Sequence, residues 1–241
     1  MSTHFNELGQ PIGAPLPGWT APPVPSFEPM SGSRCRLERA DLTRHAAALY
    51  EACAADKSGA MWTYLPYGPF DSFASFEAWF RELAAGPDPM PFAIIDQRSN
   101  RVVGLAAYLR IAPAAGSIEV GHVIYSPQLQ RATIATEAMY LLMKRAFALG
   151  YRRYEWKCDA FNAKSRAAAQ RLGFSFEGAF RQAIVYKNRS RDTAWFSVID
   201  SEWPALEAAF ERWLHPANFD ERGEQRTRLS DLTAPLLKAR G

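Results

Sequence analysis

The sequence predicts a mixed α/β fold in which helices flank a twisted, mostly antiparallel sheet. Strand-like segments rich in β-branched residues alternate with segments whose apolar residues recur at helical spacing. Several of the strands are joined by short turns typical of hairpins. Strands that come both before and after helices, with local hairpins among them, imply a mixed sheet. The 241 residues are enough for one large domain or two small ones.

A proline-rich arm makes up residues 1–32. Such a segment cannot form a continuous helix or a central strand, because proline lacks a backbone N–H and blocks the helical conformation before it. The aromatic residues Trp19 and Phe27 predict an arm that lies on the domain or on a neighbouring molecule. We expect the folded domain to span 33–214 and a polar tail to follow at 215–241.

The first half of the domain predicts three strands and two helices. A helix with Asp41 or Thr43 near its start is expected at 42–54, and an aromatic loop at 61–70 leads to the second helix. The other elements are a strand at 35–38, a helix at 72–85 and an antiparallel pair of strands at 91–96 and 102–111.

The second half predicts two strands that each lead into a helix. The strand at 118–125 is followed by a turn at 130–136 and a helix that Gly150 ends. The next strand is followed by a helix that Asn162 caps and Gly173 ends. This second strand is expected at 151–159. The elements expected after it are a hairpin of 176–187 and 192–199 around a turn at 188–191, a helix at 201–214 and a helix at 226–232.

Composition argues against several classes of function. The net charge is only +3 and the arginines are scattered, so we expect neither a nucleic acid nor a membrane as a partner. Three cysteines and four widely spaced histidines predict no disulfide framework and no metal site. No stretch approaches the ~20 apolar residues of a membrane span, and no signal peptide is recognisable, so we expect a cytoplasmic protein.

The turn at 130–136 has the features of an anion site. It contains small and polar residues and has no acidic side chain before Glu137. Unpaired N–H groups at a helix start attract anions, and the helix dipole adds to this attraction. A pyrophosphate is the natural ligand for such a turn.

Residues 130–135, Gln-Arg-Ala-Thr-Ile-Ala, resemble the pyrophosphate loop of the GNAT superfamily of acetyl-CoA-dependent N-acetyltransferases. The loop of that family is Gln/Arg-x-x-Gly-x-Gly/Ala, and Gln130 and Ala135 match its first and last positions. Thr133 stands where glycine is usual. It keeps its N–H and adds a hydroxyl donor, but a β-branched residue would be costly there if the loop required a positive φ.

A second motif of that family, Asn-x-x-Ala/Ser followed by Leu-Gly-Phe, is matched by Asn162, Ser165 and residues 172–174. The resemblance extends over 35–203 and is strongest for the branch of ribosomal-protein N-terminal acetyltransferases. It implies a GNAT-like sheet whose middle pair of parallel strands, at 118–125 and 152–159, splays apart to admit the pantetheine arm.

The resemblance also implies the reaction, which is transfer of an acetyl group from acetyl-CoA to a primary amine by direct attack in a ternary complex. The amine would belong to a protein N-terminus or to a small molecule, and no metal would take part. The expected cofactor-binding residues are Val123, Ile124, Tyr125, Gln130, Arg131, Ala132, Thr133, Ile134, Ala135, Thr136, Asn162 and Ser165.

Amide formation needs a base for the amine, a donor for the oxyanion and an acid for the leaving thiolate. Glu119 is the first candidate for the base, His122 the second and Asp159 the third. Glu119 and His122 lie three positions apart, so a regular strand would point them to opposite faces unless a bulge intervened. A solvated or paired glutamate, a packed histidine and a helix-capping aspartate are the alternative interpretations.

The acid is less clear from the pattern. Many family members carry a tyrosine seven positions after the motif asparagine, whereas this chain has Ala169. Ser165 is the available hydroxyl, and a serine on the helix surface is its alternative interpretation. The oxyanion donor is expected to be a backbone N–H near Val123 or Ile124.

The aromatic loop predicts the acceptor site. Trp62, Tyr64 and Tyr67 lie in a loop between helices, where an acceptor groove could form, although aromatic residues more often pack into a core. Arg181 and Arg191, near the late hairpin, could meet an acidic acceptor, although arginine is usually a surface residue.

Two other interpretations come from different classes of protein. A catalytically inactive CoA-binding sensor or interaction module is compatible with Ala169 and Thr133. A dinucleotide-binding oxidoreductase would need a Gly-x-Gly-x-x-Gly turn, which the sequence lacks. A homodimer could form through the proline arm or the late hairpin.

Overall fold

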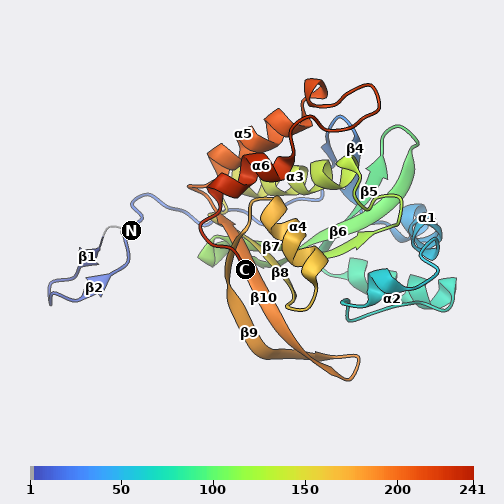
Figure 1. The fold of residues 1–241 in the computed structure, drawn as a ribbon. Helices are drawn as coiled ribbons and strands as arrows, with labels where there is room; N and C mark the ends of the chain where they lie inside the picture. Colours follow the sequence, from blue (N-terminus) through green and yellow to red (C-terminus); the bar gives the residue numbers. More distant parts are fainter. Residues whose placement is uncertain (1–2) are drawn as a thin grey trace.

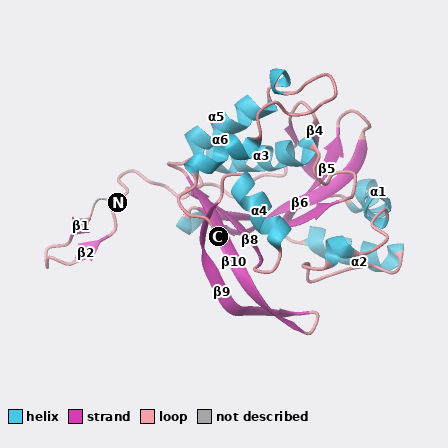
Figure 2. Ribbon diagram, viewed as in Figure 1, coloured by secondary structure: helices cyan, strands magenta, loops and turns pink. Residues whose placement is uncertain are grey.

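The computed structural model describes residues 3–241 and contains an eight-stranded sheet flanked by helices (Figures 1 and 2). The strand order is β3-β4-β5-β6-β7-β8-β10-β9, and only β7 and β8 pair in parallel. The mixed, mostly antiparallel sheet is therefore confirmed. Its strands are β3 (Met30–Ser31), β4 (Cys35–Arg39), β5 (Met90–Asp96), β6 (Arg101–Ala112), β7 (Ser117–Tyr125), β8 (Arg153–Asp159), β9 (Ser175–Tyr186) and β10 (Arg189–Ile199).

Helices cover both faces of the sheet because its central strands are apolar on both sides. Along β5, Phe92 and Ile94 belong to one hydrophobic cluster, whereas Ala93 and Ile95 belong to another on the opposite face. Helices α1 and α2 pack on the second cluster, and α3 and α5 pack on the first. The helices are α1 (Leu42–Ala54), α2 (Phe73–Ala85), α3 (Thr133–Ala148), α4 (Ala163–Arg171), α5 (Trp203–Leu214) and α6 (Leu229–Thr233).

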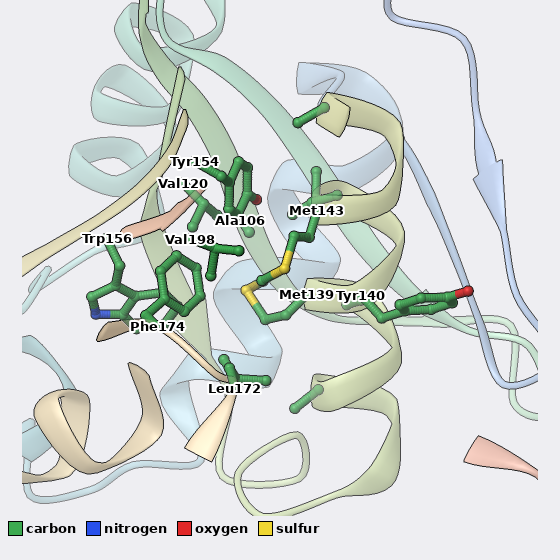
Figure 3. Packing of buried hydrophobic residues seen from close by; sticks show 14 of the residues in the cluster. Ala106, Val120, Met139, Tyr140, Met143, Tyr154, Trp156, Leu172, Phe174 and Val198 are labelled. Atoms are coloured by element: carbon green, nitrogen blue, oxygen red, sulfur yellow. The ribbon is translucent and has the colours of Figure 1, made fainter. Parts of the chain in front are cut away.

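Helix α3 is the central helix of the larger cluster. Met139 and Met143 extend from it toward Val198, while Tyr140 points away from them (Figure 3). Tyr140 stacks instead on Trp203 of α5, with ring centroids 6.2 Å apart. Helix α3 therefore packs against the sheet on one side and against α5 on another.

A buried carboxylate ties α3 to the edge of the sheet. Glu137 accepts hydrogen bonds from the backbone N–H groups of Ser33, Arg34 and Cys35 at 2.7–2.9 Å. A Cβ atom on Gly32 would lie 2.5 Å from the carboxylate carbon, so the turn between β3 and β4 needs glycine at this close approach.

The parallel pair opens in its second half, as the resemblance implies. Pairing between β7 and β8 stops at Val120 and Trp156, although the two strands continue to Tyr125 and Asp159. A bulge in β7 accompanies the opening. Gly121 pairs with Ala107 and Ile124 pairs with Leu105, so β7 has one more residue than β6 between these two pairs. His122 lies within this bulge and has a φ of 47°.

The arm divides into two parts. Residues from Trp19 onward lie on the domain, because Phe27 packs against the core and the Pro23 carbonyl accepts a hydrogen bond from Tyr151. The earlier residues form a two-stranded hairpin, β1 (His4–Phe5) and β2 (Pro11–Ile12), which projects from the body of the protein in Figure 1.

The late hairpin and the tail differ from expectation in detail. The turn of the hairpin is Lys187-Asn188, with φ values of 46° and 58°, so β10 begins at Arg189 and the predicted turn at 188–191 is wrong. Two consecutive residues with positive φ match the twist of a tight hairpin. In the tail, α6 packs on the domain, and Leu229 is fully buried in the main cluster.

Two observations concern the described residues as a whole. None of the helices within 3–241 is both long and apolar enough to cross a membrane. In the same range, no group of three or more histidine, cysteine or acidic side chains is placed to hold a metal ion.

Candidate active site

A cavity of about 450 Å³ lies where β7 and β8 separate. The aromatic loop, the two splayed strands, the start of α4 and the late hairpin form its walls. The polar and aromatic residues of the lining are Tyr64, Tyr67, Arg110, Glu119, His122, Trp156, Lys157, Cys158, Asp159, Asn162, Ser165, Phe180, Arg191, Thr193 and Trp195. Several segments far apart in the sequence therefore meet around one space.

The bulge in β7 brings two candidate bases into the same cavity. Glu119 and His122 both line it, although a regular strand would point them to opposite faces. The third candidate, Asp159, is engaged elsewhere. It accepts a hydrogen bond from the hydroxyl of Tyr186 at 2.8 Å and another from the N–H of Phe161 at 2.8 Å.

Glu119 is enclosed by cations. Only 3% of it is exposed, and its carboxylate lies 2.7 Å from Arg110 and 2.8 Å from Lys157. Lys157 is also bound to Glu155 at 2.7 Å, and its ammonium lies 3.6 Å from the ring centroid of Trp195. Accepting a proton would weaken both ion pairs of Glu119 in a site where buried charges need their partners.

His122 has the surroundings of a neutral imidazole. Burial and the positive charge of Arg110 lower the pKa of His122 below its ordinary value of 6.5. Its Nδ1 atom lies 3.0 Å from the hydroxyl of Tyr67, and the two rings are stacked at 5.7 Å. Burial raises the pKa of Tyr67, so this phenol keeps its proton.

Ser165 and Asn162 occupy the first turn of α4, beside the cavity. The Asn162 side chain accepts a hydrogen bond from the N–H of Ser165 at 3.1 Å, which confirms Asn162 as the helix cap. The Ser165 hydroxyl accepts a hydrogen bond from the indole of Trp156 at 3.0 Å. Ala169 is buried and lies outside the cavity lining, so no side chain there replaces the missing tyrosine.

The predicted pyrophosphate loop forms the turn before α3. Arg131 has a φ of 62°, whereas Thr133 is the first residue of the helix and does not take a positive φ. Ala132, the residue before the helix, makes no side-chain cap, and the first turn contains no acidic residue. The substitution of threonine for glycine is therefore accommodated without backbone strain.

The other predicted cofactor residues differ in exposure. Val123 lines the cavity beside the bulge, whereas Ile124 is buried beneath it. The hydroxyl of Tyr125 donates to the carbonyl of Ala135 at 3.3 Å, and Thr136 accepts a hydrogen bond from Arg171 at 2.9 Å. The side chains of Gln130 and Arg131 are exposed, and those of Ala132, Thr133 and Ile134 are half-buried.

The aromatic loop contributes two of its three predicted residues to the cavity. Tyr64 and Tyr67 line it, but Trp62 is 5% exposed and packs into the core between Tyr67, Phe70 and Trp79. Trp62 therefore anchors the loop to the hydrophobic core and does not line the cavity.

The tip of the late hairpin holds the loop in place from the other side. Lys187 donates to the Trp62 carbonyl at 2.9 Å, and Arg189 donates to the Thr63 carbonyl at 3.0 Å.

Sequence reasoning missed the cationic partners of Glu119. Lys157 is four residues after the start of β8, and Arg110 lies in an irregular part of β6 with a φ of 47°. The alternation of Glu155, Trp156 and Lys157 was a usable signal, because it places both charged side chains on one face of β8. No local pattern marked Arg110.

Comparison with known proteins identifies the family. The model of the Acetyltransferase (GNAT) domain matches residues 34–175. A GCN5-related N-acetyltransferase from Brucella melitensis is 44% identical, with a TM-score of 0.89 over 91% of this chain and 100% of that protein. A GNAT-family acetyltransferase from Chromobacterium violaceum is 43% identical, with a TM-score of 0.77 over 81% of this chain and 98% of that protein.

A more distant likeness concerns the fold alone. The acetyl transferase from Salmonella typhimurium that modifies the N-terminal serine of the ribosomal protein L7/L12 is 22% identical. Its TM-score is 0.62, over 71% of this chain and 99% of that protein. Among curated proteins, none is similar enough in sequence to match. The family model and the two closely similar structures confirm the resemblance found in the motifs, and the chain belongs to the GNAT family of acetyltransferases.

Proposed function

We propose that this acetyltransferase moves an acetyl group from acetyl-CoA to a primary amine by direct attack in a ternary complex. The observation that carries the proposal is that a neutral histidine and a helix-start serine share one cavity at the point where the parallel strands separate. The acceptor amine belongs to a protein N-terminus or to a small molecule, and the family alone does not decide between them.

The residues present fit the pyrophosphate of acetyl-CoA. The N-terminus of α3, a helix of 16 residues, carries no acidic side chain in its first turn, and Arg131 precedes it. The N–H groups of Ala132 and Ala135 already donate to backbone carbonyls, so those of Arg131, Thr133 and Ile134 would hold the phosphates, with the helix dipole adding to the attraction. Asn162 and Ser165 would contact the pantetheine arm, which would pass between β7 and β8. When bound, acetyl-CoA supplies an activated thioester.

In this proposal His122 is the general base. Its Nδ1 lies 3.0 Å from the oxygen of Tyr67. In the tautomer that this proposal assigns, Nδ1–H donates to that oxygen and Nε2 is free to take a proton from the amine, directly or through a water molecule. Glu119 remains a candidate from the sequence, but its two ion pairs favour a role in fixing the floor of the cavity.

Ser165 is the proposed proton donor to the leaving thiolate, and a backbone N–H near Val123 is the proposed oxyanion donor. Beyond Val120, the edge of β7 that faces β8 has no strand partner among the described residues, which supports the second assignment. Holding the amine next to the thioester supplies much of the remaining acceleration.

Substitution of His122 tests the base. We expect His122→Gln to lower kcat by about 10²- to 10⁴-fold, because the variant keeps a polar side chain but cannot accept a proton. Thiol release is measured with a panel of amines, and acetyl-CoA affinity is measured separately. An unchanged kcat would return the role to Glu119.

Thr133→Pro tests the cofactor loop. Thr133 is the first helical residue, and Ala132 has φ −80° and ψ 151°, so proline fits there and removes one N–H without breaking the helix. We expect calorimetric affinity for acetyl-CoA to fall about 10- to 100-fold. Thr133→Ala, which keeps the N–H, is the matched control and should bind nearly as well as the native protein.

The inactive CoA-binding module makes a different prediction. It would bind acetyl-CoA with the same dependence on Thr133 but release no thiol with any amine. Turnover on an amine that His122→Gln abolishes would exclude it.

Two further expectations belong to this proposal. A cytoplasmic location agrees with three cysteines that are all free and buried. A homodimer is proposed through the projecting arm, whose apolar side chains Phe5, Leu8 and Ile12 are exposed.

A further inference from the structure

Arg191 differs from the other cations of the cavity. Arg110 and Lys157 are both paired with Glu119, and Lys157 also with Glu155. Arg191 lines the same cavity and is half-buried, yet no carboxylate within the described residues lies in ion-pair range of it. Its guanidinium therefore retains donors for a ligand.

The Arg191 side chain is held in place by neutral groups. Its Nε donates to the buried hydroxyl of Thr193 at 3.1 Å, and its guanidinium lies 6.0 Å from the ring centroid of Tyr186. Neither contact compensates the positive charge. Asp159, the other acid of the lining, is already engaged by Tyr186 and by the N–H of Phe161.

Arg191 is therefore the cation that distinguishes the cavity. The lining contains Arg110, Lys157 and Arg191 against Glu119 and Asp159, and Glu155 also pairs with Lys157, so within the described residues Arg191 is the lining cation that has no carboxylate partner. An unpaired guanidinium in the cavity disfavours polyamines and other polycations. It favours an acceptor whose amine is accompanied by an anionic group.

The rest of the wall near Arg191 is apolar and aromatic. Phe180 and Trp195 stack at 4.5 Å, Ile184 lies on the same hairpin, and Tyr64 and Tyr67 come from the aromatic loop. Such a wall favours a ring or an aliphatic chain over a polar group.

We propose that Arg191 recognises a carboxylate of the acceptor, and that the acceptor is a small amino acid-like amine with an aromatic or aliphatic body. The carboxylate pairs with the guanidinium, the apolar body lies against Trp195 and Phe180, and the amine is directed to His122. This inference rests on the proposed function, because it assigns the acceptor of that same site.

Phenylalanine, phenylalanine amide and phenethylamine are the probes, since they share the amine and the ring but differ in the carboxylate. Calorimetry measures their binding to the protein saturated with CoA, and thiol release measures turnover with acetyl-CoA. Arg191→Met keeps the length of the side chain and removes its charge. Arg181→Met is the matched control, because Arg181 is exposed on the same hairpin outside this cavity.

We expect native protein and Arg181→Met to bind phenylalanine about 10- to 100-fold more tightly than phenethylamine. Arg191→Met should lose this preference while its affinity for acetyl-CoA stays unchanged. Equal binding of the three probes to the native protein would overturn the inference, as would a preference that survives in Arg191→Met. A loss of acetyl-CoA affinity in Arg191→Met would also overturn it, because Arg191 would then serve the cosubstrate.

Failure of the proposed function gives a different result. In that case no amine releases thiol, whereas the binding preference for the carboxylate and its dependence on Arg191 can still be measured without turnover.

Discussion

His122 illustrates how one backbone irregularity changes what a residue can do. The residue pattern identified His122 and Glu119 as candidates, and their spacing allowed both of them in the cleft only if a bulge intervened. The bulge that reconciles them lies between the pairs Ala107–Gly121 and Leu105–Ile124, whose members are well separated along the chain, so the strand's own sequence could not reveal it. Residue type was predictable here, but orientation was not.

The pKa of His122 gives a direct test of its surroundings. Burial and Arg110 lower this pKa, so His122 should titrate below 6.5 in the free protein. Removing the charge in Arg110→Met should raise the pKa toward 6.5, because the imidazolium form is then less disfavoured. NMR titration of the histidine ring protons measures both values, with His122→Gln assigning the signal. A pKa of His122 at or above 6.5 in the native protein would contradict a buried, neutral imidazole at this position.

Substitution of Glu119 distinguishes a structural role of this residue from a catalytic one. Glu119→Gln weakens the contact with the buried Lys157, which keeps Glu155 as its carboxylate partner, so we expect the free energy of unfolding to fall by about 1.5–3 kcal/mol. Urea denaturation measures this change. Glu77→Gln, which removes an exposed pair with Arg81 at 3.5 Å, is the control and should cost less than about 1 kcal/mol.

The opposite outcome has an equally clear meaning. A Glu119→Gln variant of native stability whose kcat falls by about 10²- to 10⁴-fold would make Glu119 the base.

Among the elements, those with strong local signals, such as capping and periodicity, could be predicted from their own sequence. Elements that depend on contacts with distant parts of the chain could not. The helix at 42–54 has the expected bounds and Asp41 as its cap, because capping and periodicity are local signals. The short strand β3 and the packing of α6 depend on partners far along the chain. Trp62 is similar: a loop position suggested a ligand contact, and only the packing of α2 beneath it shows that it is core.

The link between α3 and the β3–β4 turn is a testable long-range contact. Glu137 accepts hydrogen bonds from three backbone N–H groups and from the Ser33 hydroxyl. A glutamine at this position has one acceptor oxygen fewer and would place its two N–H donors against the N–H groups of the turn. We expect Glu137→Gln to lower the free energy of unfolding by about 2–4 kcal/mol. Thermal denaturation checks this, with Glu82→Gln on the exposed face of α2 as the control. A change equal to that of the control would mean that water replaces the contact at little cost.

The whole molecule joins a well-packed domain to an arm that is only partly attached. The C-terminal tail closes onto the domain, because the Phe176 N–H donates to the Ala239 carbonyl at 3.2 Å and the backbone N–H of Lys238 donates to the Ser175 hydroxyl at 2.9 Å. The β1–β2 hairpin of the arm pairs His4 with Ile12 and Phe5 with Pro11, and an isolated hairpin of this size is marginal in water.

Removal of this hairpin tests the homodimer. Phe5 is 63% exposed and Leu8 is 81% exposed, and Ile12 and Leu16 are exposed beside them, so a second copy would gain apolar contacts by covering the arm. We expect light scattering to find a dimer for the native chain and a monomer after deletion of residues 1–18. Acetyl-CoA affinity should be unchanged, because the arm lies outside the cavity lining. A native monomer, or a dimer that survives the deletion, would contradict the role of the arm, and in the second case the exposed Val185 of the late hairpin becomes the contact to substitute.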